Sequence, residues 1–440
     1  MTKVITYGTY DLLHEGHIRL LKRAKALGDY LIVGITADGF DLARGKINVS
    51  QSLMERIDAV KSTGLADQII VEEYEGQKID DVQKYGIDVF TVGSDWVGKF
   101  DYLEDYCKVI YLDRTEGISS SMIRSDYRKM RIGIIGEGTL ANKFFHECQF
   151  VNGVIPSGIF TENSESLDKE LREISVNSII DLLKHSDAVY VVSMPRKHFY
   201  HCWLALTNNK HVLCESPICL RVKDYDLLQH IANEKGLVLM DGIKTAYSLA
   251  FSRMMLLIKG GIIGNIVAID TTCTSLLDKI TPFTWDSLSW WGPTAILPFS
   301  LIMGTDYKDV QMVKGMSDDN PIFALFTYGS FIYNSGVATF KVGQGVKSEG
   351  EMIISGTKGY VYVPAPWWKT DYFEIRYENP ANNRRYFYQL DGEGIRHEIR
   401  CFSDLIEGKL ISITVSPAQS RMIISIFEKS NYAYRLDNNT

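Results

Sequence analysis

Two histidines, His14 and His17, are the residues whose types and spacing most directly suggest chemistry in this chain. They follow a strand-like run that ends at Gly8 and stand near the start of a segment with helical periodicity. Three-residue spacing places both imidazoles on one helix face, beside backbone N–H groups that favour an anion. Gly16 lets a phosphate approach the backbone closely. The pair would stabilise the charged phosphorus of a nucleotidyl-transfer transition state; two solvated or structural histidines are the alternative.

A glycine turn marks a second candidate site. Gly136, Gly138 and Ala141 follow a strand-like run and open a helix, as a dinucleotide fingerprint requires. The first glycine makes the turn, the second admits a pyrophosphate, and the small third residue lets helix and strand pack. The next predicted strand ends at Thr161 and Glu162, where an acid would bind a ribose diol. Because no arginine is adjacent to receive a 2'-phosphate, the pattern slightly favours NADH over NADPH. A fold retained without cofactor is the alternative.

The elements that must position these groups fall into three parts. Strands alternate with helices over residues 1–130 and again over 131–250, which predicts two parallel, doubly wound sheets. Longer alternating runs follow residue 265 and predict a large, mainly antiparallel sheet with one buried face. We therefore predict a Rossmann-like α/β domain (1–130), a dinucleotide-binding Rossmann domain (131–250) and an α+β domain for substrate binding or oligomerisation (251–440).

Composition limits the classes of partner. A formal charge of -7 argues against broad nucleic-acid binding, which needs a basic surface. The seven cysteines form no CxxC pair, so we expect neither a zinc site nor a disulfide framework. The chain opens without a signal-type apolar run and contains no 18-residue apolar segment. We expect a cytoplasmic protein that acts on small molecules and does not bind a membrane.

The segments Gly8 to His17 and Arg114 to Ser119 together resemble the two signatures of the cytidylyltransferase family, and most of all its glycerol-3-phosphate members, over residues 1–130. The resemblance implies CMP transfer from CTP to a phosphorylated acceptor, with release of pyrophosphate. It places magnesium, which accompanies CTP, near Asp11. The catalytic residues that it implies are His14, His17, Lys46 and Arg114. The nucleotide-binding residues that it implies are Gly8, Thr9, Tyr10, Asp11, Gly16, Arg44, Arg56, Asp95, Thr115, Gly117, Ile118 and Ser119.

The acceptor side departs from the glycerol-phosphate pattern. Those enzymes carry a second arginine on the helix after Arg56, and that position falls at Gly64 here. A tryptophan typical of the following loop is replaced near Tyr74 or Glu75. We therefore expect the acceptor to be a phosphorylated small sugar or polyol that need not be glycerol 3-phosphate.

The segment from Asp187 to Leu220 resembles the core of the Gfo/Idh/MocA oxidoreductases, and the resemblance extends over residues 131–435. It implies carbonyl reduction with NAD(P)H. The family's Glu-Lys-Pro reads Glu215-Ser216-Pro217 here, and residues 289–304 contain neither partner of its Asp/His motif. We expect Lys244 to replace them as acid or oxyanion partner, with Tyr247 and His198 as weaker candidates. The cofactor-binding residues that we predict are Gly136, Gly138, Thr139, Leu140, Ala141, Thr161, Ser193, His198 and Glu215.

Two nucleotide sites in one chain suggest consecutive reactions. The leading hypothesis is CMP transfer to a sugar or polyol phosphate such as fructose 6-phosphate, with NAD(P)H-dependent reduction to a CDP-alditol such as CDP-glucitol for surface polysaccharide synthesis. One alternative is a monofunctional cytidylyltransferase whose second half is an inactive binding or oligomerisation module. Another is a dehydrogenase whose first domain senses nucleotide. In each case we expect a homo-oligomer.

Overall fold

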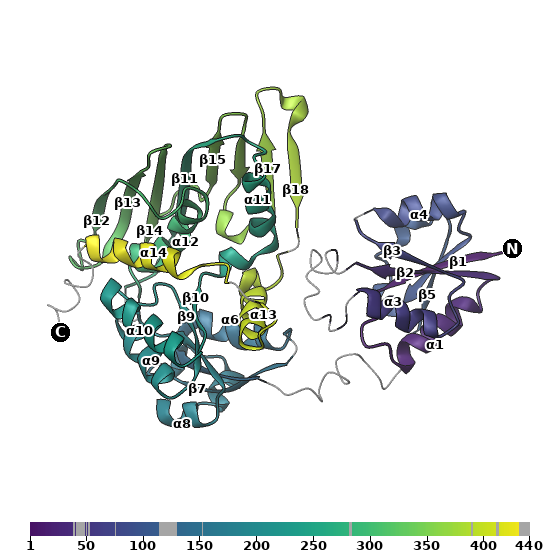
Figure 1. Cartoon of the computed structure of the whole chain (residues 1–440), viewed down its shortest axis with the longest axis horizontal. Coiled ribbons are helices and arrows are strands. Elements are labelled where there is room, and N and C mark those ends of the chain that lie inside the picture. Colours follow the sequence, from purple (N-terminus) through teal and green to yellow (C-terminus); the bar gives the residue numbers. More distant parts are fainter. Residues whose placement is uncertain are drawn as a thin grey trace. The chain divides into compact units, whose positions relative to one another are not determined.

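The computed structural model describes residues 1–37, 40, 49, 51, 53–74, 76–113, 130–151, 153–280, 284–388, 390–410 and 413–430. The chain divides into two compact units, Met1–Arg128 and Lys129–Thr440 (Figure 1). Within the described residues, no helix has both the length and the apolar character to cross a membrane.

The first unit is built on five parallel strands in the order β3-β2-β1-β4-β5. Buried aliphatic residues such as Val4 and Ile5 fill the central strand, and helices pack on the sheet. Because the order reverses between β1 and β4, the carboxyl ends of these two strands flank the crevice where open α/β sheets bind ligands. The elements are β1 (Lys3–Gly8), α1 (Glu15–Lys25), β2 (Tyr30–Thr36), α3 (Leu53–Ser62), β3 (Gln68–Glu72), α4 (Gln77–Tyr85), β4 (Val89–Gly93), η1 (Ser94–Trp96), η2 (Asp101–Leu103) and β5 (Lys108–Leu112).

The second unit begins with another parallel sheet, in the order β10-β9-β8-β6-β7. Its strands are near-continuous apolar runs, as expected for strands covered on both faces. The elements are β6 (Met130–Gly136), α6 (Gly138–Cys148), β7 (Val154–Phe160), η4 (Ser164–Ser166), α7 (Lys169–Glu173), α8 (Ile179–Lys184), β8 (Ala188–Val192), α9 (Pro195–Thr207), β9 (His211–Glu215), α10 (Val222–Glu234), β10 (Leu239–Gly242) and η5 (Lys244–Tyr247).

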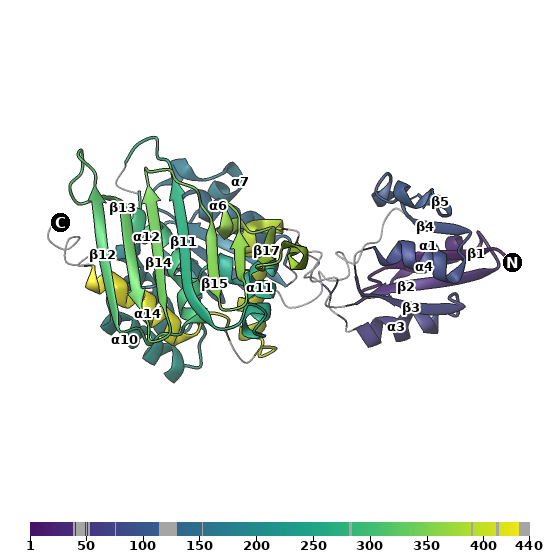
Figure 2. The same cartoon turned by 90° about the horizontal axis from the view of Figure 1, so that it is seen from above.

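An eight-stranded sheet follows, in the order β12-β13-β14-β11-β15-β16-β17-β18 (Figure 2). Only the β11–β14 pair is parallel. Its elements are α11 (Leu249–Lys259), β11 (Ile266–Ser275), α12 (Ser287–Ile302), β12 (Asp309–Met316), β13 (Ala324–Ile332), β14 (Val337–Gln344), β15 (Met352–Gly356), β16 (Tyr360–Val363), η6 (Trp367–Lys369), β17 (Tyr372–Arg376), η7 (Pro380–Asn382), β18 (Arg384–Phe387), η8 (Asp391–Gly394), α13 (Ile395–Ile406) and α14 (Pro417–Lys429).

Helix α12 is the central helix packed on the eight-stranded sheet. It is apolar on nearly every side and therefore buried, and it packs against β11, β13 and β14 on one side and α14 on the other (Figure 1). Two parallel Rossmann-type sheets followed by a large, mainly antiparallel sheet confirm the predicted fold class. The predicted division of the second unit at residue 250 stays a prediction.

Candidate functional site

The histidine pair of the first unit lies at the N-terminus of α1. Strand β1 ends at Gly8, and His14 is the N-cap, whose Nδ1 accepts a hydrogen bond of 3.1 Å from the Gly16 N–H. The rings of His14 and His17 stack with centroids 3.9 Å apart. Both imidazoles are thus neighbours at a helix end that attracts anions, which is the arrangement that the spacing predicted.

Two buried residues, Tyr10 and Asp11, fix the conformation of the loop between β1 and α1. Tyr10 is buried with a φ of 54°, and the edge of its ring meets His17 at 5.5 Å between centroids. Burial raises the pKa of the Tyr10 phenol above its ordinary value. The buried Asp11 accepts a hydrogen bond of 2.9 Å from the Gln51 N–H. These contacts give the loop one defined course.

Asp11 is compatible with the predicted magnesium. Mg²⁺ is usually held by one or two carboxylates together with substrate phosphates, so one buried carboxylate beside a phosphate site suffices. In the part of the chain that the structure describes, no group of three or more His, Cys, Asp or Glu side chains is arranged to hold a metal by itself.

Arg56 has a different place from the one that the sequence suggested. Its side chain is fully buried and donates to the carbonyl oxygens of Thr9 (2.8 Å), Thr36 (2.9 Å) and Gln51 (3.2 Å). It therefore joins the ends of β1 and β2 and positions these loops, and its predicted contact with the nucleotide stays a prediction. The exposed Asp95 follows β4, the strand that flanks the same crevice. The predicted residues that lie outside the described ones are Arg44, Lys46, Arg114, Thr115, Gly117, Ile118 and Ser119.

A buried ion pair beside this site was missed from the sequence. Glu72, the last residue of β3, pairs with Lys78 of α4, and the Thr36 hydroxyl donates to Glu72 at 2.9 Å. The Tyr7 hydroxyl donates to Asp81 at 2.7 Å next to this pair. The helical period of α4 could not have shown that Lys78 is buried, because a charged side chain on a helix usually faces solvent.

The glycine turn of the second unit fits a dinucleotide pyrophosphate. A Cβ on Gly136 would lie 2.4 Å from the carbonyl carbon of Val192, so only glycine is accommodated there. Gly138 has a φ of 84°, and a Cβ on it would meet no atom within 4 Å, so its surface is open to a ligand. Ala141 is fully buried beneath the turn. A cavity of about 230 Å³ lies over these residues, and its lining includes Gly138, Thr139, Leu140, Asn163 and Ser166.

The residues that follow β7 bear on whether the unit prefers NADH or NADPH. The Thr161 hydroxyl oxygen accepts a hydrogen bond of 3.0 Å from the Asn163 N–H, and Glu162 forms an ion pair with Lys197 of α9. Lys197 is a cation that could receive a 2'-phosphate, and it stands 35 residues away in the sequence. The slight preference for NADH, which rested on the absence of a neighbouring arginine, therefore loses its support.

His198 belongs to the framework of the site. It is fully buried, and its ring nitrogens lie 2.8 Å and 2.6 Å from the carbonyl oxygens of Pro217 and Ser193. Burial lowers the pKa of His198 to about 4. Ser193 in turn contacts His201 through its hydroxyl, at 2.8 Å. Both ring nitrogens of His198 thus face the backbone and join the ends of β8 and β9, and its predicted roles in binding cofactor and donating a proton stay predictions.

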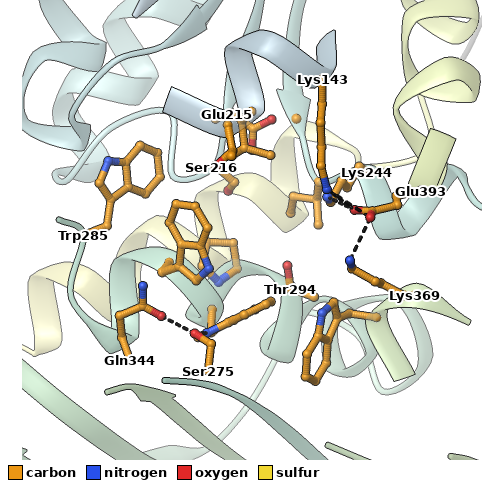
Figure 3. Close-up of a pocket in the computed structure, with 18 of the residues that line it drawn as sticks. Lys143, Glu215, Ser216, Lys244, Ser275, Trp285, Thr294, Gln344, Lys369 and Glu393 are labelled. Atoms are coloured by element: carbon orange, nitrogen blue, oxygen red, sulfur yellow. Dashed lines mark hydrogen bonds and ion pairs between the residues drawn. The ribbon is translucent and has the colours of Figure 1, made fainter. Parts of the chain in front are cut away.

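A cavity of about 360 Å³ in the second unit lies where the parallel sheet and the large sheet meet (Figure 3). The turn contributes Thr139 and Leu140, and the end of β9 contributes Glu215 and Ser216. Helix α12 and the loops around it supply an aromatic wall. The tryptophans in this wall are Trp285, Trp290, Trp291 and Trp368.

Three lysines in this cavity converge on Glu393 (Figure 3). Their ammonium nitrogens lie 2.9 Å (Lys143), 3.0 Å (Lys244) and 2.7 Å (Lys369) from its carboxylate oxygens. Burial opposes ionisation of Glu393, but the contacts with Lys369, Lys244 and Lys143 outweigh it and lower its pKa to about 2. Lys244 therefore belongs to a charged group that lines the cavity, and its predicted role as acid or oxyanion partner stays a prediction.

Three acidic side chains, Glu215, Asp241 and Glu398, interact electrostatically with one another beside this cavity. Glu215 faces the cavity and accepts a hydrogen bond of 2.5 Å from the Tyr190 hydroxyl, and burial raises its pKa to about 7. Burial also raises the pKa of Asp241 to about 6, although the hydroxyls of Ser420 and Ser216 favour its charged form. Burial raises the pKa of Glu398 well above its ordinary value. A pKa of about 7 suits Glu215 to proton exchange with a molecule in the cavity at neutral pH.

Comparison with known proteins assigns both units. A model of the family described as cytidylyltransferase-like matches residues 5–126, and one described as an oxidoreductase family with an NAD-binding Rossmann fold matches residues 130–243. The glycerol-3-phosphate cytidylyltransferase of Bacillus spizizenii is 52% identical over 126 residues, which are 29% of this chain and 97% of that protein. Its counterpart from Staphylococcus aureus is 50% identical over 126 residues, 29% of this chain and 95% of that protein.

Solved structures resemble the remainder in fold. The UDP-N-acetylglucosamine 3-dehydrogenase GnnA from Acidithiobacillus ferrooxidans has a TM-score of 0.59 at 21% identity, covering 68% of this chain and 96% of that one. KijD10, a 3-ketoreductase from Actinomadura kijaniata solved with TDP-benzene and NADP, has a TM-score of 0.60 at 18% identity with the same coverage.

Fold and comparisons together define an enzyme with a nucleotidyltransferase unit and a dinucleotide-binding unit. The chain belongs to the cytidylyltransferase family through its first unit, and its second carries a domain of the NAD-binding oxidoreductase family. Both predicted resemblances are confirmed.

Proposed function

We propose that the chain makes a CDP-activated polyol in two steps, CMP transfer from CTP to a small sugar or polyol phosphate and reduction of a carbonyl with NAD(P)H. The main support is that one chain carries two features that each fit a nucleotide phosphate: the histidine pair at α1 and the open glycine turn at α6. Fructose 6-phosphate is the acceptor we propose to test first, with CDP-glucitol as product. Such a CDP-alditol would serve surface polysaccharide synthesis.

In the first step, a phosphate oxygen of the acceptor attacks the α-phosphorus of CTP, and the bond to the pyrophosphate leaving group breaks. His14 and His17 donate hydrogen bonds to the phosphate oxygens as negative charge gathers on them. Lys46 and Arg114 would add positive charge, and Asp11 would bind the Mg²⁺ that accompanies CTP. The acceptor half differs from the glycerol-phosphate pattern at Gly64, which supports a different acceptor.

In the second step, the turn from Gly136 to Ala141 would hold the pyrophosphate of a nicotinamide cofactor, which would supply a hydride to the carbonyl carbon. Glu215 would donate a proton to the carbonyl oxygen. We assign the proton to Glu215 because it lines the cavity, receives a hydrogen bond from Tyr190 and has a pKa of about 7, which suits an acid at neutral pH. GnnA and KijD10, named as a nucleotide-sugar dehydrogenase and a ketoreductase, support sugar oxidoreduction as the reaction class.

The test follows NADH and NADPH absorbance with CTP and a panel of ketose phosphates, while pyrophosphate is measured in parallel. The proposal expects both signals with at least one ketose phosphate. Pyrophosphate release without cofactor oxidation for every carbonyl compound would favour the alternative, a monofunctional cytidylyltransferase with an inactive second module. The presence of Ser216 in place of the family lysine makes this comparison necessary.

A further inference from the structure

The lysine cluster around Glu393 carries more positive charge than its partner neutralises. Lys143, Lys244 and Lys369 all contact this one carboxylate, and the shared group lines the 360 Å³ cavity. Three ammonium groups and one carboxylate leave a net charge of about +2 at neutral pH. One lysine would neutralise Glu393, so the cluster carries more positive charge than a single ion pair requires.

The backbone fixes the carboxylate at this place. Glu393 has a φ of 51° and stands between Gly392 (64°) and Gly394 (90°). A left-handed conformation at a residue with a side chain costs free energy and persists where the surroundings enforce it. A Cβ on Gly394 would lie 2.3 Å from the carbonyl oxygen of Lys244, so the turn and the lysine backbone are packed tightly together. The acid is therefore held in register with the lysines.

The surroundings make the excess charge effective. The tryptophans on α12 and beside it cover much of the cavity wall, and a less polar wall strengthens an electrostatic attraction. A phosphate group carries about -1.5 to -2 charge at neutral pH and offers three acceptor oxygens, which matches the charge and the donors of the cluster. The adjoining cavity over the glycine turn, which would take the phosphates of the dinucleotide, shares Thr139 and Leu140 with this one but is not lined by the three lysines.

We infer that Lys143, Lys244 and Lys369 form a phosphate-recognition site for the substrate of the second unit, in which Glu393 holds the lysines apart until the phosphate takes over their hydrogen bonds. This inference rests on the proposed reductase function and adds its substrate class. The carbonyl compound carries a phosphate, either as a sugar phosphate or as the diphosphate of a nucleotide sugar. The free sugar lacks the group that the cluster binds.

The test measures binding by calorimetry in the full chain with His17→Ala, which weakens phosphate binding in the first unit. Fructose 6-phosphate and CDP are the phosphorylated probes, and fructose and cytidine are their controls. Adding Lys369→Met should weaken at least one phosphorylated probe by about tenfold, the value of one hydrogen bond between charged groups. Lys223→Met, at an exposed position on α10, is the matched control and should change nothing.

The two probes separate the two sources of phosphate. If Lys369→Met weakens the binding of fructose 6-phosphate, reduction precedes CMP transfer. If it weakens the binding of CDP, reduction follows CMP transfer. Equal affinity of both probes for the chain with and without Lys369→Met would overturn the inference. Binding that depends on Lys369, without cofactor oxidation for any carbonyl compound, would keep the phosphate site and reject the proposed reductase function.

Glu393→Gln should change the affinity for the phosphorylated probe in the direction opposite to Lys369→Met. The amide keeps the shape of the side chain but removes the negative charge, so the cluster rises from about +2 to +3 and the phosphorylated probe should bind several-fold more tightly. A merely structural role for Glu393 predicts weaker binding, because the lysines would lose their organiser. Weakening equal to that of Lys369→Met would contradict the exchange of partners that we infer.

Discussion

The candidate sites of the two units are assembled in different ways. In the first unit, one strand, one turn and one helix supply the central groups, and His14 contacts Gly16 and His17 within a single stretch. In the second unit, Glu393 contacts Lys143 across 250 residues and Lys244 across 149. The first kind of site can be read from a motif, whereas the second exists only once the chain has folded.

The sites also differ in how they use charge. The first presents imidazoles at a helix end, where backbone N–H groups contribute to anion binding. The second sets a lysine cluster against a buried acidic group made of Glu215, Asp241 and Glu398. We expect phosphate chemistry at the first and proton transfer at the second, so single substitutions should separate the two activities.

The largest expected effect is on CMP transfer. His17→Ala should lower pyrophosphate release by about 10²- to 10³-fold, because it removes a donor to the developing charge. Reduction of a separately supplied carbonyl substrate should be unchanged. Arg19→Ala, an exposed neighbour on α1, is the control. Equal loss of both activities would show that the sites are not independent.

Glu215→Gln should break the second activity alone. Removing the acid should slow cofactor oxidation by about 10²-fold, within the usual range for general acid catalysis, and leave pyrophosphate release intact. In the unmodified chain, the reduction rate should fall as pH rises through about 7, since Glu215 then loses its proton. A pH profile that is the same with glutamine at this position would rule out Glu215 as the donor.

Arg56→Met tests whether the first site depends on its buried framework. The substitution leaves the carbonyl oxygens of Thr9, Thr36 and Gln51 without this donor, so the free energy of unfolding of the first unit should fall by about 3 kcal/mol. Urea unfolding followed through Trp96, the one tryptophan among residues 1–130, reports on this unit. Arg19→Met should change stability by less than about 0.5 kcal/mol. Equal decreases in the free energy of unfolding for Arg56→Met and Arg19→Met would contradict the framework role of Arg56.

Asp241→Asn should have the smallest effect, on the pH dependence of stability in the second unit. The pKa of Asp241 is raised from 3.8 to about 6 in the folded chain, so its protonated form contributes stability that is complete below pH 3.8 and lost as pH rises through 6. Between pH 5 and 8 this amounts to about 1 to 2 kcal/mol. The asparagine variant should show a flatter decline in thermal or urea unfolding. An unchanged slope would show that Asp241 does not titrate in this range.

The sequence predicted what depends on local spacing and periodicity. The two parallel sheets, the antiparallel third sheet and the position of His14 and His17 followed from strand–helix alternation and a three-residue interval. The sequence could not predict that Arg56 is buried, since burial of a charge depends on which carbonyls surround it after folding. Nor could it reveal Glu393, which stands in a short turn without motif and gains its meaning from three distant lysines.

The surroundings of Lys244, the predicted acid or oxyanion partner of the second site, could not be predicted for the same reason. Lys244 was chosen because it follows a strand end on the expected face, and it does line the cavity. Its pairing with Glu393 and the raised pKa of Glu215 both arise from burial and from neighbours on other elements. Residue type and strand position therefore located the cavity but not the distribution of protons inside it.

The most direct test of two consecutive reactions is isotope transfer into the activated product. The chain is incubated with CTP, a ketose phosphate and NADH or NADPH deuterated at the transferable position, and the CDP-linked product is measured by mass spectrometry. The account predicts a CDP-alditol that carries one deuterium, and its loss with either His17→Ala or Glu215→Gln. A CDP-linked product without deuterium for every ketose phosphate would contradict it.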